Sequence, residues 1–168
     1  MRFLLLVTLL TWTLTTSAQT IVQKFSFGKY TLKTQNEHSI FSMPGTRNMA
    51  APGNPAQPYQ LTNILLPPGA KVTNVHIKIT KKQHIELNHD LMPMQHVQPL
   101  SVAEKHGFVK NKSSYAKTKN LDIGESIIVN QERMNGYDIA QIKFSPIEYY
   151  PVQKSIDLAN ELELIVEY

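Results

Sequence analysis

The residue types that carry enzymatic chemistry are present in this sequence, but they are not arranged as a recognisable site. His84, His89, His96 and Asp90 lie near one another and are the candidates for metal ligands. Histidine spacings of five and seven do not place the side chains on one face of a helix, and residues an odd number apart on a strand point to opposite faces. We interpret them as surface histidines and expect no metal site and no cofactor.

The motifs of nucleophilic and nucleotide chemistry are also missing from the sequence. None of the 168 residues is cysteine, which excludes a thiol nucleophile, a disulfide framework and a cysteine-ligated zinc site. No G-x-S-x-G elbow, P-loop, G-x-G-x-x-G or H-E-x-x-H motif occurs. We therefore predict a protein without catalytic residues.

The basic residues point to binding instead. Residues 105–120 contain five lysines and no acidic residue, whereas the other basic residues are dispersed among the acidic ones. A nucleic-acid-binding protein concentrates its positive charge on one face, so we expect no nucleic-acid partner. The lysine-rich segment fits a solvated loop, a contact with an anionic surface, or a loop presented to a protease that prefers basic residues. The sequence alone does not separate these three interpretations.

An aromatic cluster at residues 148–151 (EYYP) has two interpretations. It could pack at the end of a strand, or it could offer flat aromatic faces to a sugar. The single tryptophan, Trp12, lies in the N-terminal segment discussed below, which weakens a carbohydrate-binding role.

Short strands must position these residues. Apolar residues alternate with polar ones at positions 72–79, 137–144 and 162–167, the period of half-buried strands. Asn135-Gly136 between two apolar runs predicts a hairpin. Residues 44–69 contain six prolines, and we expect an extended crossing there, interrupted by an apolar run at 61–66. The pattern predicts an all-β sandwich or jelly roll with a single domain. The expected core positions are Val75, Ile77, Ile79, Ala140, Ile142, Phe144, Leu162, Leu164 and Val166.

The N-terminus has the pattern of a secretory signal peptide. A positive start is followed by the apolar run FLLLVTLL at residues 3–10 and by small residues up to Ala18. The run is too short to span a bilayer, which takes about 20 residues. We predict a signal peptide at residues 1–18, cleavage between Ala18 and Gln19, and a domain at residues 19–168. This domain has no second long apolar stretch, so we expect a secreted protein without a membrane span, located in the periplasm, at the cell surface or outside the cell.

Four ordered blocks resemble the prodomain of gingipain-type cysteine peptidases, peptidase family C25. The first comprises residues 53–58 (GNPAQP) and 64–72 (ILLPPGAKV), and the second is the proline-rich stretch at 91–99. The third comprises residues 135–139 (NGYDI) and 145–151 (SPIEYYP), and the fourth is the closing strand at 162–168 (LELIVEY). Gln57, Asn135 and the Leu121-Asp122 pair depart from the family pattern.

The resemblance implies a β-sandwich that assists the folding of a secreted cysteine peptidase and holds it latent. Its partner would be the cognate catalytic domain, in cis or in trans. Family members continue into a caspase-like peptidase with a Cys–His pair, whereas this sequence has no cysteine and stops at Tyr168, so we expect a separately encoded or truncated prodomain. In family members that prefer basic residues, a basic side chain blocks the specificity pocket. The candidates for that contact are Lys110, Lys112, Lys117 and Lys119.

Two alternatives to the prodomain remain at this point. One is an extracellular β-sandwich module that binds a glycan or a protein. The other is an exported enzyme of unrecognised kind.

Overall fold

The last strand of the chain, β10 (Ser155–Glu167), is the centre of the first sheet. The computed structural model describes residues 19–97, 107–119 and 122–168. In it, β10 pairs along one edge with β6 (Asn74–Glu86), and its other edge is shared by β9 (Ile147–Tyr150) and β1 (Thr20–Ser26). A bulge at Asn160 separates the two halves of β10, and the Asn160 carbonyl accepts a hydrogen bond from the backbone N–H of Phe27 at 2.7 Å.

The second sheet has the strand order β4-β5-β8-β7. It contains β4 (Arg47–Met49), β5 (Gln57–Leu66), β8 (Tyr137–Phe144) and β7 (Ile128–Met134), all antiparallel. The expected hairpin joins β7 and β8 through Asn135 and Gly136, which have φ angles of 51° and 86°. Positive φ at both positions is typical of the type I′ turn, which matches the twist of paired strands.

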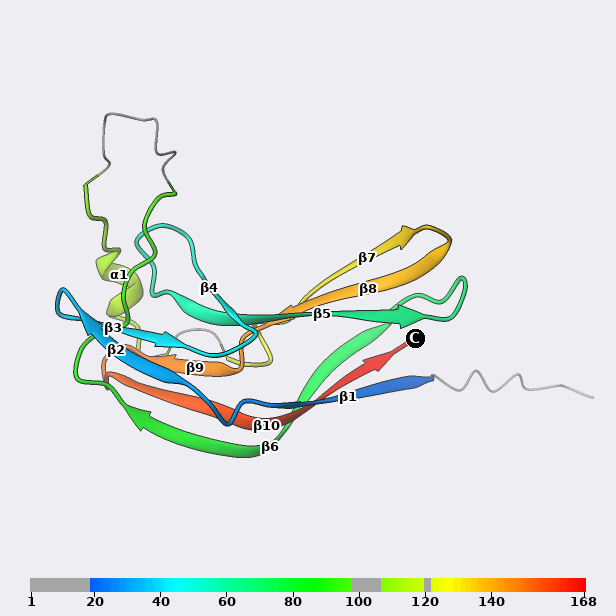
Figure 1. Ribbon diagram of the computed structural model, residues 1–168, viewed down its shortest axis with the longest axis horizontal. Coiled ribbons are helices and arrows are strands. Elements are labelled where there is room, and N and C mark those ends of the chain that lie inside the picture. Colours follow the sequence, from blue (N-terminus) through cyan, green and yellow to red (C-terminus); the bar gives the residue numbers. More distant parts are fainter. Residues whose placement is uncertain (1–18, 98–106, 120–121) are drawn as a thin grey trace, which may run out of the picture.

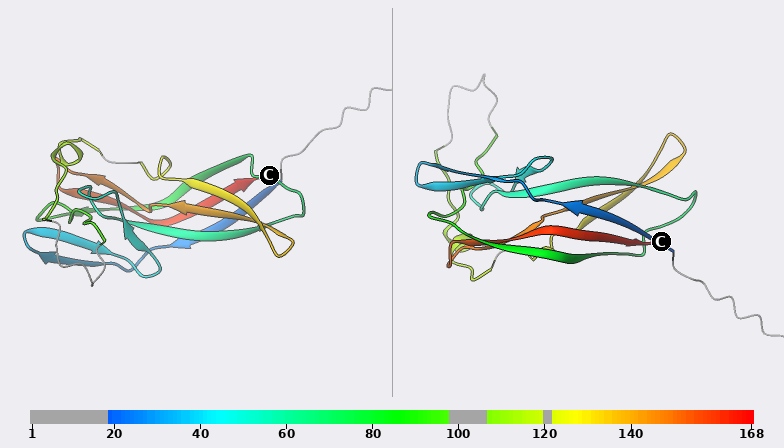
Figure 2. Two further views of the ribbon diagram at one scale, coloured as in Figure 1. Left: turned by 90° about the horizontal axis from the view of Figure 1, so that it is seen from above. Right: turned by 60° about the horizontal axis from the view of Figure 1, so that its bottom comes forward.

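Two smaller elements lie at one end of the two sheets. The strands β2 (Thr31–Gln35) and β3 (His38–Ser42) form a hairpin of their own, and α1 (Lys112–Tyr115) is a single helical turn. Both lie at the same end of the molecule in Figures 1 and 2. Among the described residues, no helix is long and apolar enough to cross a membrane.

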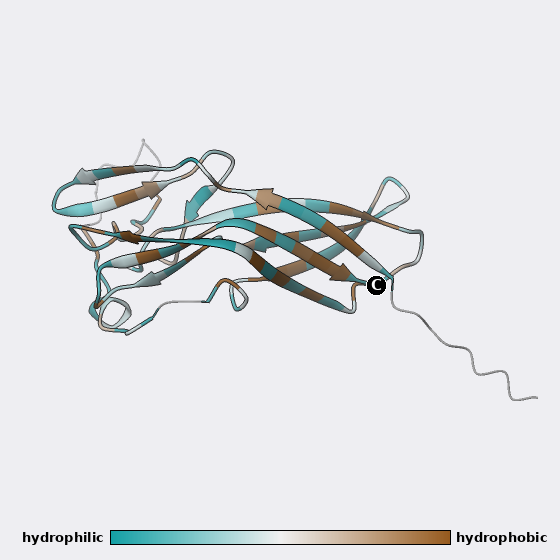
Figure 3. Cartoon of the chain, turned by 90° about the horizontal axis from the view of Figure 1, so that it is seen from below, coloured by the Kyte–Doolittle hydropathy of each residue, from teal (hydrophilic) through white to brown (hydrophobic). Residues whose placement is uncertain are grey.

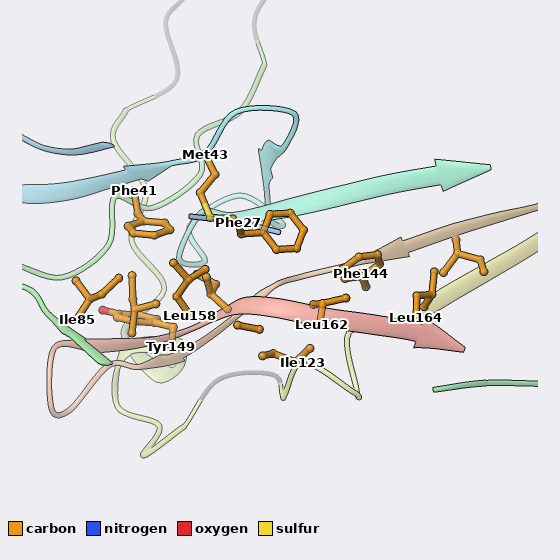
Figure 4. Packing of buried hydrophobic residues seen from close by; sticks show 14 of the residues in the cluster. Phe27, Phe41, Met43, Ile85, Ile123, Phe144, Tyr149, Leu158, Leu162 and Leu164 are labelled. Atoms are coloured by element: carbon orange, nitrogen blue, oxygen red, sulfur yellow. The ribbon is translucent and has the colours of Figure 1, made fainter. Parts of the chain in front are cut away.

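The core fills the space between the two sheets. Figure 1 shows β5 and β8 above β10 and β6, and Figure 3 shows apolar and polar residues alternating along these strands. Phe144 of β8 meets the ring of Phe25 of β1 edge to face, with centroids 5.3 Å apart. Figure 4 shows Phe27, Leu158 and Leu162 in the same cluster. The predicted all-β sandwich is therefore confirmed.

Most of the expected core positions are buried or half-buried, but the prediction for Ile79 is wrong. Six of them on β8 and β10 are at most 1% exposed: Ala140, Ile142, Phe144, Leu162, Leu164 and Val166. On β6, Val75 and Ile77 are half-buried, and Ile79 is 37% exposed. Ile79 is exposed because β6 is the edge strand of its sheet, and because Ile79 pairs with Leu162 where the register shifts.

The proline-rich crossing is more regular than expected. β5 begins at Gln57, four positions before the predicted apolar run, and it pairs there with β4. Pro58 has no N–H to donate. Because β5 pairs with β8 only from Gln60 onward, the proline removes no hydrogen bond between these two strands.

Candidate functional site

The lysine-rich segment is anchored to the body of the domain at its first described part. The backbone N–H of Asn111 donates to the carbonyl of Gly53 at 2.9 Å, and the N–H of Gly53 donates to the carbonyl of Met94 at 2.7 Å. Gly53 has a φ of +85°, and a Cβ there would lie 3.1 Å from Val109 and 3.2 Å from the Asn111 nitrogen. Glycine is therefore required both for the conformation and for the close approach of this segment.

Side-chain amides hold the segment in place. The carboxamide of Gln95 bonds the backbone of Val109 twice, accepting from its N–H at 2.9 Å and donating to its carbonyl at 3.0 Å. The Asn54 side-chain oxygen accepts hydrogen bonds from Asn111 at 3.0 Å and from the Ser114 hydroxyl at 2.7 Å. These bonds anchor residues 109–114 to the domain, while residues 107–113 remain exposed to solvent.

A cap starts the short helix within this segment. The Asn111 side-chain oxygen accepts from the backbone N–H of Ser113 at 3.2 Å and from its hydroxyl at 2.8 Å. Asparagine is among the residues preferred at this position because its side chain satisfies a helix N–H that has no partner within the helix. The cap therefore stabilises the first turn, which contains Lys112.

Two of the four candidate lysines are tied to the domain. Lys110 bonds the carboxylate of Asp90 at 2.8 Å and lies 4.4 Å from the ring centre of Tyr115. Lys119 pairs with Asp122 and lies 3.6 Å from Glu148. Both ammonium groups therefore already have partners within the domain.

The other two candidates project outward. Lys112 and Lys117 are exposed, and neither forms an ion pair with a residue that the structure describes. Lys112 is the first residue of the capped turn, and Lys117 follows its C-cap residue Ala116. Lys117 also lines a hollow beside Ser114. These are the features expected of side chains that reach a partner.

A charged cluster lies where the segment returns to the first sheet. Glu148 is 8% exposed, and its carboxylate accepts from Lys82 at 2.7 Å and from the Tyr150 hydroxyl at 3.1 Å. Burial opposes ionisation of Glu148, but the hydrogen bonds from Lys82 and Tyr150 outweigh it and hold the pKa of this carboxyl below its usual range. Burial likewise disfavours the charged form of Lys82, yet Glu148 and Asp157 raise the pKa of Lys82 to about 12.

The candidate histidines and the aromatic cluster differ in their exposure: His84 and His96 are exposed, His89 is half-buried, and Tyr149 is buried. His84 lies 2.6 Å from a carboxylate oxygen of Asp157, and Asp90 holds Lys110. Within the described ranges, no group of three or more His, Cys, Asp or Glu residues could hold a metal ion. Tyr149 is fully buried, and its hydroxyl accepts from the backbone N–H of Leu91 at 3.1 Å. The cluster at residues 148–151 therefore packs in the core and offers no pair of aromatic faces.

Comparisons with known proteins agree with the fold. The family model Propeptide_C25 matches residues 13–168. A solved structure that concerns the zymogenic latency of gingipain K from Porphyromonas gingivalis is similar over 91% of this chain and 89% of that chain, with 26% sequence identity and a TM-score of 0.71. The complex of the pro- and mature domains of RgpB from the same organism is similar over 92% of this chain and 83% of that chain, with 15% identity and a TM-score of 0.67. A comparison with curated proteins found no match.

Proposed function

This chain belongs to the propeptide family of C25 peptidases, and from that membership we propose that it assists the folding of a gingipain-like cysteine peptidase and holds it latent. The domain itself is non-catalytic, since the chain contains no cysteine that could act as the nucleophile. The observation that carries the proposal is the family match, which covers most of the chain. The structural likeness to gingipain K, whose structure concerns latency, supports it.

The anchored basic segment is the part of this domain that we assign to the peptidase cleft. Latency by binding requires a stable interface, which commonly buries about 1,600 Å² in total. It also requires that little conformational entropy is lost when the inhibitory segment binds. The bonds from Gly53, Asn54 and Gln95 hold residues 109–114 in place in advance, which lowers this cost. Lys112 and Lys117 are the side chains available to enter a pocket that prefers basic residues.

Inhibition of a purified catalytic domain tests the proposal. Residues 19–168 contain every described strand, and they should inhibit a C25 catalytic domain from the same organism in a dose-dependent manner, measured with a fluorogenic peptide. They should also raise the yield of active enzyme when the denatured catalytic domain is refolded. Papain, an unrelated cysteine peptidase, is the control and should keep its activity. A chain that neither binds nor inhibits any C25 catalytic domain of that organism would overturn the proposal and favour an extracellular binding module.

We further propose that the domain is exported. The signal-peptide pattern at residues 1–18, which lie outside the described residues, supports this, and so does membership in a family of peptidase propeptides that includes gingipains. The domain would meet its peptidase in the periplasm, at the cell surface or outside the cell.

A further inference from the structure

The outer face of the second sheet carries a row of side chains that the core does not use. Residues two apart on a strand share a face, so Tyr59 and Leu61 of β5 point away from the core, on the opposite side from Ile64. Across the strands, Tyr59 pairs with Arg47 of β4, and Leu61 pairs with Lys143 of β8. In Figure 1 these three strands lie next to one another in the upper layer.

Two adjoining hollows make this row a groove. The first has a volume of about 450 Å³ and is lined by Gly45, Arg47, Met49, Tyr59, Leu61 and Lys143. The second, of about 280 Å³, shares Met49 and Tyr59 with the first and is also lined by Ser114 and Lys117. We call the two hollows together the β4–β5 groove. It begins at Lys143 and ends at the basic segment.

The charge of the groove is one-sided. Arg47, Lys117 and Lys143 line it, and no acidic residue of the described chain does. Lys143 lies 5.3 Å from the ring centre of Tyr59, and it forms no ion pair with a residue that the structure describes. The acidic residue Glu132 of β7 is on the same outer face, but it lies outside the groove. It pairs with Ile139 of β8, which is four residues from Lys143 along that strand.

Exposed apolar side chains lie between these cations. Leu61 is 60% exposed and Met49 is 43% exposed, and both line the first hollow beside Tyr59. An apolar surface framed by cations fits a partner in which carboxylates flank aliphatic or aromatic side chains. A basic partner would be repelled by all three cations.

We propose that the β4–β5 groove binds an acidic segment of the peptidase catalytic domain, with carboxylates on Arg47 and Lys143 and an apolar side chain against Met49, Tyr59 and Leu61. This inference rests on the function proposed above. Its second support is continuity, because Lys117 belongs both to the groove and to the segment assigned to the cleft. A catalytic domain that covers this segment therefore also reaches the end of the groove.

A charge reversal tests the electrostatic part of the inference. The variant Arg47→Glu/Lys143→Glu should associate with an inactive C25 catalytic domain at least tenfold more slowly than the wild-type chain at low salt, measured by surface plasmon resonance. At 0.5 M salt the difference should nearly vanish, because screening removes long-range steering. The matched control is Lys33→Glu/Lys71→Glu, which changes net charge equally at two exposed lysines outside the groove, and its association rate should stay within about twofold of wild type.

A second variant tests the apolar part and guards against misfolding. Leu61→Ala leaves the core unchanged, since Leu61 is largely exposed, and it should raise the dissociation rate at least threefold. Wild-type inhibition combined with unchanged rates for both groove variants would overturn the groove while leaving the prodomain function intact. Heparin serves as a general polyanion probe in the same assay. If Arg47→Glu/Lys143→Glu lost heparin binding but bound the catalytic domain like the wild type, the groove would be a polyanion site, and the inference would be overturned. Absence of any wild-type binding would instead contradict the proposed function itself.

Discussion

At the scale of single residues, the four lysines of the basic segment form two classes. Lys110 and Lys119 are held by carboxylates of the domain, whereas Lys112 and Lys117 project without an ion pair to any described residue. We predict that Lys112→Ala/Lys117→Ala weakens inhibition more than tenfold, or about 1.4 kcal/mol. The fourfold alanine variant should not be much weaker than this double variant.

The pair Lys110→Ala/Lys119→Ala is the matched control for this prediction. Its inhibition should stay within about fivefold of wild type, because a partly exposed ion pair contributes about 0–1 kcal/mol. Inhibition constants for the three variants and the wild type decide the matter. Equal potency of all four proteins would remove these side chains from the latency mechanism.

At the scale of elements, the Glu148 cluster joins the end of the basic segment to the first sheet. Its carboxylate contacts Lys82 of β6, Tyr150 of β9 and Lys119 of the segment. Since its pKa is lowered in the folded state, its contribution is present above the unfolded value of about 4.3 and is lost as the pH falls through the folded pKa. We predict that Glu148→Gln lowers the free energy of unfolding by about 1.5–3 kcal/mol at pH 7.

Urea denaturation at pH 7 and pH 3 measures this effect. The difference between wild type and Glu148→Gln should shrink at pH 3, because the carboxyl of the unfolded chain is then largely protonated and the lowered pKa of the folded state contributes less to stability. Glu86→Gln is the matched control, since Glu86 is exposed and forms no ion pair with a described residue, and it should unfold like the wild type at both pH values. A difference that is the same at both pH values would mean that the charge of Glu148 does not stabilise the fold.

Local patterns in the sequence were sufficient to predict the hairpin and the inner faces of β8 and β10. A period of two and an Asn-Gly turn depend only on neighbouring residues, which is why Ala140, Ile142 and Phe144 were correctly placed in the core. Ile79 was misplaced, because burial on β6 depends on its edge position in the sheet, which no local pattern encodes.

The candidate site was only partly predictable for the same reason. The lysine run is visible in the sequence, but the partners that distinguish its members are distant along the chain. Asp90 lies 20 residues from Lys110, and Asn54 lies 60 residues from Ser114. The β4–β5 groove likewise depends on cross-strand neighbours such as Leu61 and Lys143, which are paired only in the folded sheet.

At the scale of the whole molecule, the first and last described strands, β1 and β10, are antiparallel neighbours, and β1 is paired over its full length. Gln19 and Tyr168 exchange two backbone hydrogen bonds of 3.1 and 3.0 Å, and β1 covers the second half of β10. Signal cleavage after Ala18 would leave this pairing complete, whereas cleavage several residues later would remove rungs from it. We therefore predict that the exported protein begins at Gln19, which its intact mass will show. A species that keeps residues 3–10 would contradict the signal peptide.

Deletion of residues 19–26 tests why that boundary matters to the fold. It removes β1, uncovers the edge of β10 from Glu161 to Glu167, and takes away the ring of Phe25 that packs against Phe144. Loss of a packed aromatic side chain alone costs about 3–5 kcal/mol, so the deletion should lower the free energy of unfolding by at least this much in urea. A chain that keeps Ser17 and Ala18 is the matched control and should unfold like the chain that begins at Gln19. If the deletion left stability unchanged, β1 would be dispensable, and the position of signal cleavage would not be constrained by the fold.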